Sequence, residues 1–206
     1  MRHSRSIAAA LAACLALAAL PATSHDHMHP GGAPEAQMPL PGGSIYNLES
    51  SWTTQDGTAA KVDSLRGEPV IAAMIYTSCK DMCPAIVADM LWIEKHLPPR
   101  AVGHVRFALF SFDSLVDTPV RLKGYAAEHG MDAGAWTLFH SDPDAVRELA
   151  AALGVRYRPD GKGGFDHASV ISLIDADGTI VFQQKGTEVT PKELVARLGA
   201  IAAPRF

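Results

Sequence analysis

The sequence predicts an α/β fold with a mostly parallel central sheet and antiparallel strands at its edge. Two apolar runs, at residues 70–75 and 105–111, are the expected buried central strands. Helical patterns alternate with strands from residue 85 onward, and a hairpin of strands 169–175 and 179–183 precedes the last helix. Alternating strands and helices form parallel pairs, whereas a hairpin adds an antiparallel pair. The sequence therefore predicts a mixed sheet flanked by helices.

Local signals place the remaining elements in chain order. Asp56-Gly57 marks the turn of an N-terminal hairpin, because this dipeptide is typical of tight two-residue turns. Pro98-Pro99 ends the first long helix, and Thr118-Pro119 caps and opens the second. The expected elements are hairpin 51–58, helix 85–97, helix 118–128, strand 136–139, a helix from 141–143 to 153–154, a glycine-rich loop at 157–164, and a helix from 190.

The first 44 residues are expected to lie outside the folded domain at 45–206. Residues 1–22 combine Arg2 and Arg5 with an unbroken apolar run, which is the pattern of a secretory signal peptide. Cleavage is favoured over retention as a membrane anchor and over lipidation at Cys14. Residues 23–44 are rich in proline and glycine, as in a flexible tail. The expected location is the periplasm or cell envelope.

Composition narrows the classes of partner. The chain has 206 residues, of which 48% are hydrophobic and 19% charged, and this is enough for one domain with a real core. Its net charge is −4, with no basic run beyond the first few residues, so nucleic acid is not an expected partner. Membrane association is expected only through an uncleaved N-terminal segment.

Cys79 and Cys83 lie where the first buried strand turns into a helix. The start of a helix stabilises thiolate, the form that binds metals and attacks disulfides. The C-x3-C spacing is one residue longer than that of thioredoxin-like redox motifs. Because a disulfide closing so small a loop stabilises little, the pair is predicted to react or to bind a metal. Export would place it where a disulfide is permitted.

His167 precedes the strand at 169–175. The order of elements, with cysteines after the first buried strand, matches the thioredoxin fold with an inserted segment. In that fold the loop before this strand faces the cysteines and usually carries a cis-proline, but here His167 takes its place. One interpretation is a polar residue capping a strand. The other is a metal site of two thiolates and one imidazole, a set that suits Cu(I) and Cu(II) better than a four-ligand zinc site.

Several further residues have two interpretations each. Asp113 and Asp117 flank a loop at a strand end, where they would steer a cationic partner, hydrogen-bond His167, or simply be solvated. Met82 is expected to contact a partner. The tail histidines either bind metal, as His-rich tracts can, or belong to a solvated tail: His25, His27 and His29. The other histidines are expected at the surface or at element ends: His96, His104, His129 and His140.

Three motifs in order carry a family resemblance. Residues 79–84 (Cys-Lys-Asp-Met-Cys-Pro) resemble the C-x3-C-P motif of the Sco/SenC/PrrC family of copper-binding cytochrome c oxidase assembly proteins. Residues 111–119 are similar to that family's S-x-D-P-x-x-D-T-P segment, with Ser114 in place of the usual proline. Residues 166–169 resemble its D-H-S/T element, with Ala168 after the histidine. The resemblance covers roughly residues 45 to 200.

The resemblance implies a thioredoxin-like copper metallochaperone, not an enzyme, that assists assembly of the CuA centre of cytochrome c oxidase. It implies Cys79, Cys83 and His167 as copper ligands, and the copper-bearing oxidase subunit or another copper protein as partner. The alternative is a cell-envelope thiol–disulfide oxidoreductase with Cys79 and Cys83 as its redox-active disulfide. A thiol peroxidase is a third hypothesis, but the proline and threonine spacing usual in that class is absent ahead of Cys79.

Overall fold

A computed structural model describes residues 39–186 and 191–201. The expected signal peptide, Cys14 and the three tail histidines lie outside these residues. Among the described residues, no helix has the length and apolar character needed to cross a membrane.

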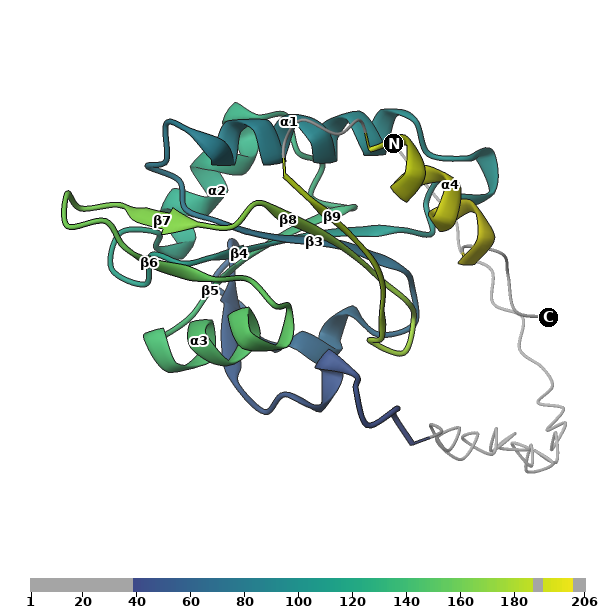
Figure 1. The fold of residues 1–206 in the computed structure, drawn as a ribbon, viewed down its shortest axis with the longest axis horizontal. Helices are drawn as coiled ribbons and strands as arrows, with labels where there is room; N and C mark the ends of the chain where they lie inside the picture. The colour runs from purple at the N-terminus through teal and green to yellow at the C-terminus, as the bar shows by residue number, and fades with distance from the viewer. Residues whose placement is uncertain (1–38, 187–190, 202–206) are drawn as a thin grey trace, which may run out of the picture. The chain divides into compact units, whose positions relative to one another are not determined.

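A seven-stranded mixed sheet forms the centre of the fold (Figure 1). Strands β3, β4 and β5 are parallel, while β1, β8 and β9 join by antiparallel pairing, and β2 pairs with β1 as the predicted N-terminal hairpin. The order across the sheet is β2-β1-β5-β4-β3-β8-β9. The strands are β1 Ser51–Thr54, β2 Ala59–Lys61, β3 Val70–Ile75, β4 Arg106–Ser111, β5 Trp136–His140, β8 Val170–Ile174 and β9 Ile180–Lys185.

Helices cover both faces of this sheet. In Figure 1, α1 (Met82–Lys95), α2 (Pro119–Glu128) and α4 (Lys192–Ile201) lie above the sheet, and α3 (Pro143–Ala152) lies below it. The chain steps from β3 to β4 to β5 in one direction, so right-handed crossovers place α1 and α2 on the same face. Burial on both faces explains why every residue of β3 and β8 is buried and why, apart from Ser172 in β8, their sequences are apolar.

The segment expected as a glycine-rich loop at 157–164 was wrongly assigned. It contains strand β6 (Tyr157–Pro159), which pairs with β7 (Phe165–His167) as a separate two-stranded sheet. The glycines are confined to the turn, where Gly161 and Gly163 have φ of 74° and 89° and the Asp160 carboxylate accepts two backbone N–H groups. His167 is therefore the last residue of a strand.

The carboxyl ends of β3 and β4 meet at one edge of the sheet, because the two strands are parallel and in register. The segment from Tyr76 to Asp81 leaves β3 there, and the segment from Phe112 to Thr118 leaves β4 beside it. This edge is where open α/β sheets place their ligand sites.

Candidate metal centre

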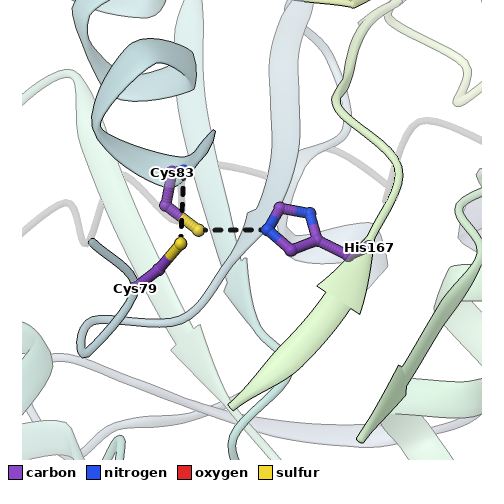
Figure 2. A group of neighbouring side chains, drawn as sticks. All are labelled: Cys79, Cys83 and His167. Carbon is purple, nitrogen blue, oxygen red and sulfur yellow. Dashed lines mark hydrogen bonds between the residues drawn. The ribbon is translucent and has the colours of Figure 1, made fainter. Parts of the chain in front are cut away.

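The structure brings Cys79, Cys83 and His167 together, and one potential ligand atom from each lies within 4.8 Å of the others (Figure 2). Cys83 is the second residue of α1 and is buried, whereas Cys79 is half-buried in the turn before the helix. Cys79 lies outside the helix, and its N–H is donated to the Tyr76 carbonyl at 3.2 Å. Both are free thiols. Two sulfurs and one nitrogen thus converge from two distant segments.

Cys79 is the thiol that ionises more readily. Burial opposes its ionisation, but hydrogen bonds from the backbone N–H groups of Cys83 and Asp81, together with those from the Cys83 thiol and the Tyr76 hydroxyl, outweigh it and lower its pKa. The Cys83 N–H is donated to the Cys79 sulfur at 3.4 Å. This N–H belongs to the first turn of α1, so for Cys79 the contact agrees with the expected stabilisation of thiolate by a helix start. For Cys83 that expectation was wrong, because its pKa is raised.

Cys83 has the opposite electrostatic environment. Burial raises the pKa of its thiol far above the ordinary value, and the neighbouring Cys79 and Asp117 charges raise it further. Its sulfur lies 3.4 Å from Nε2 of His167. In the metal-free protein Cys83 is therefore a protonated thiol beside this nitrogen, and a cation has to displace its proton to bind.

The imidazole of His167 is oriented for coordination through Nε2. Its Nδ1 lies 3.2 Å from the Ala168 carbonyl oxygen, which can only accept, so Nδ1 carries the proton. The Nε2 lone pair then faces Cys83. Burial lowers the pKa of His167 despite the opposing Ala168 hydrogen bond, so the ring stays neutral as a metal ligand must be. Its side chain is buried, and the interpretation of His167 as a mere strand cap does not account for this placement.

Aromatic rings surround the imidazole. Phe112 and Tyr76 lie with ring centroids 5.1 Å and 6.0 Å from that of His167. Phe165 packs edge-on against Tyr76 at 5.3 Å. This apolar wall excludes water from one side of the group, so charge interactions inside it are stronger than at an open surface.

Asp117 braces the cysteine turn, whereas Asp113 bonds within its own loop, and neither carboxylate bonds to the histidine of the site. Asp117 is fully buried and accepts from the Thr77 N–H at 2.9 Å, from the Ser111 hydroxyl at 2.6 Å and from the Thr77 hydroxyl. Asp113 is also buried and accepts from the N–H groups of Leu115 and Val116. The expected bond to His167 and the alternative of simple solvation were therefore wrong, and steering of a cationic partner stays a prediction. Asp117 instead fixes Thr77, two residues before Cys79.

The remaining candidate residues of the described chain stay outside the metal group. His96 and His129 bond through Nδ1 to carbonyls one turn earlier at helix ends, as expected, and His104 is exposed. His140 lies on strand β5. Met82 is half-buried at the start of α1, and its expected partner contact stays a prediction.

Known proteins resemble this chain over most of its described residues. A family model for SCO1/SenC matches residues 43–203. The SCO1 protein homolog of Bacillus subtilis is 29% identical over 150 residues, which cover 71% of this chain and 77% of the relative.

Solved structures of Sco proteins are also similar to this chain. ScoI of Bradyrhizobium japonicum, solved with copper bound, is 27% identical with a TM-score of 0.62, covering 74% of this chain and 96% of that one. BsSco, described as having a disulfide switch and as a member of the Sco family of cytochrome c oxidase assembly proteins, is 27% identical with a TM-score of 0.64, covering 75% and 92%. The fold is thioredoxin-like, and the chain belongs to the SCO1/SenC family.

Proposed function

We propose that this protein is a copper metallochaperone in which Cys79, Cys83 and His167 bind one copper ion and pass it to another copper protein. The observation that carries this proposal is the convergence of two thiol sulfurs and one neutral imidazole nitrogen within 4.8 Å. Thiolates are soft ligands that select Cu(I), and imidazole also accepts Cu(II). Within the described residues the group offers no fourth Cys, His, Asp or Glu ligand, which disfavours a structural zinc site.

The three residues have different roles in binding copper and in transferring it. Cys79 is half-buried and has the lowered pKa, so it is the ligand that first meets an incoming ion or an incoming thiolate of a partner. Cys83 and His167 are buried and already touch each other, so they complete the site without large rearrangement. Transfer to a partner then proceeds by ligand exchange that begins at Cys79.

The proposed recipient is the copper-bearing subunit of cytochrome c oxidase, with assembly of its CuA centre as the outcome. Support comes from membership of the SCO1/SenC family and from the description of BsSco as one of the cytochrome c oxidase assembly proteins. The basic n-region and apolar run of residues 1–22 support a location in the periplasm or cell envelope.

A thiol–disulfide reductase is the second candidate function. The pairing of a low-pKa Cys79 with a nearby second thiol favours it, because such a thiolate attacks disulfides and its neighbour resolves the mixed disulfide. One feature counts against the reductase. The described residues contain no cis peptide bond, so the cis-proline typical of a thioredoxin-like substrate groove is absent there.

Copper titration of the reduced protein tests the proposal. We expect one strongly bound copper at the Cys–Cys–His group, and a sulfur-to-copper charge-transfer band after Cu(II) addition. The matched control is the variant His25→Ala/His27→Ala/His29→Ala, which should keep both. Absence of the band in this variant would contradict the proposal.

A parallel assay of protein-disulfide reduction without copper separates the two functions. Efficient turnover that Cys79→Ala abolishes and His167→Ala leaves unchanged would favour the reductase. For a metallochaperone we expect only slow turnover, because His167 and the buried Cys83 are arranged as ligands.

A further inference from the structure

The imidazole of His167 is carried by a hairpin that is separate from the main sheet. Within residues 39–186 and 191–201, strands β6 and β7 pair only with each other, so the hydrogen-bond ladder of the seven-stranded sheet does not fix them. Cys83 and His167 are 84 residues apart in sequence. A contact between the hairpin and the cysteine turn is therefore needed to set the distance between sulfur and nitrogen.

Tyr76 makes this contact. It follows β3 directly, and its own carbonyl accepts the N–H of Cys79. Its hydroxyl accepts the N–H of Phe165 at 3.3 Å and lies 3.5 Å from the Phe165 carbonyl oxygen. Its ring packs edge-on against both Phe165 and His167. One buried side chain thus joins the segment that presents Cys79 to the backbone two residues before His167.

Gly164 shows how closely the two segments approach. A Cβ at this position would lie 2.9 Å from the Tyr76 hydroxyl oxygen and 2.9 Å from Oδ2 of Asp160. Real Cβ atoms do not come so close, so any larger residue would push the phenol or the hairpin aside. The absence of a side chain at 164 is what lets the Tyr76 hydroxyl reach the hairpin backbone.

We propose that Tyr76 is a positioning residue that holds His167 against the two thiols and thereby sets the preference of the site between Cu(II) and Cu(I). This inference rests on the proposed copper function. Two thiolates can hold Cu(I) by themselves, whereas Cu(II) gains more from the imidazole. Loosening the hairpin therefore weakens Cu(II) binding more than Cu(I) binding, which raises the reduction potential of the bound copper.

The variant Tyr76→Phe tests this inference, because it removes the hydroxyl and keeps the ring. We expect the Cu(II) affinity to fall about tenfold, the lower end of what losing an outer hydrogen-bond partner of a ligand costs. Cu(I) affinity should change much less, and the charge-transfer band should weaken or shift. The matched control is Tyr46→Phe, which removes a buried hydroxyl bonded to the Leu65 carbonyl, in a segment that packs on the far turn at Gly178. It should leave both affinities unchanged.

Gly164→Ala is a second way to move the hairpin that carries His167 away from Tyr76. We expect it to lower the ratio of Cu(II) to Cu(I) affinity as Tyr76→Phe does. The double variant should be no worse than either single variant, because both disturb one contact. In the metal-free protein, NMR signals of the His167 ring should shift in Tyr76→Phe and in Gly164→Ala but not in Tyr46→Phe.

The outcomes separate this inference from the proposed function. Failure of the unmodified protein to bind copper through thiolate would remove the proposed function and the inference with it. Normal copper binding with an unchanged Cu(II) to Cu(I) ratio in Tyr76→Phe would overturn the inference alone. Equal losses for both ions, with Gly164→Ala unaffected, would also overturn it, since they would place the effect on the Cys79 thiolate.

Discussion

Replacing Cys83 by alanine is expected to lower copper affinity several hundredfold. Structural zinc sites with four ligands bind with ~10–16 kcal/mol, and by the same share per ligand one lost thiolate costs roughly 3–4 kcal/mol. The remaining thiol and imidazole cannot match a site built around two soft sulfurs. Competition with a Cu(I) chelator measures the affinity. Retention within about tenfold of the unmodified protein, a loss of only ~1.4 kcal/mol, would contradict the assignment of Cys83 as a ligand.

Val87→Ala is the matched control for this substitution. Val87 is buried one turn further along the same helix and carries no donor atom. It should lower stability by about 1–2 kcal/mol through lost packing and leave copper affinity unchanged. If Val87→Ala weakened copper binding as much as Cys83→Ala, disturbed packing of α1 would explain both results.

Asp117→Ala is expected to destabilise the fold by about 3 kcal/mol, because it leaves several polar groups unsatisfied. The fully buried carboxylate accepts from the Thr77 N–H and hydroxyl and from the Ser111 hydroxyl, and Arg121 lies 3.6 Å away. Denaturant unfolding of the metal-free protein measures the loss. Thr77 should also become free to move, so the variant should bind copper more weakly than its remaining stability alone would explain.

Asp113→Ala is the control for this prediction. The Asp113 carboxylate accepts from N–H groups in its own loop, at Leu115 and Val116, and makes no bond to the cysteine turn. Its loss should cost about 1 kcal/mol, as for a lost helix or turn cap. Equal effects of the two substitutions would show that Asp117 does not brace the cysteine turn.

The grouping of Cys79, Cys83 and His167 in space could be predicted from sequence because its signals are local. Cys79 and Cys83 stand at the end of an apolar strand and the start of a helix, and His167 stands just before another buried strand. Strand ends that share a sheet edge converge in space, so the pattern already placed the three residues together. The mixed sheet was predictable for the same reason, since alternation of strands and helices restricts the topology.

The hairpin of β6 and β7 could not be predicted in this way. Its strands are three residues each, one of them ends in Pro159, and glycines fill the turn between them. Proline and glycine normally indicate a loop, and the pairing depends on the aromatic packing of Phe112, Tyr157 and Phe165. Tertiary packing therefore determines the strand conformation of a segment whose local sequence favours a loop.

The roles of Asp117 and Tyr76 were hidden for a different reason. Their partners lie 40 and 89 residues away, at Thr77 and Phe165. The pattern of apolar and polar residues within one helix or strand does not predict a side-chain contact over such a separation. The available signal was position: each residue directly follows or closely follows a central strand that ends at the site, where side chains from distant segments meet.

X-ray absorption at the copper edge is the most direct test of the central claim. In the protein with His25, His27 and His29 replaced by alanine, we expect a copper environment of two sulfurs and one nitrogen. His167→Ala in the same background should lose the nitrogen and keep both sulfurs. A sulfur-free copper environment, or a nitrogen that persists without His167, would contradict the site formed by Cys79, Cys83 and His167.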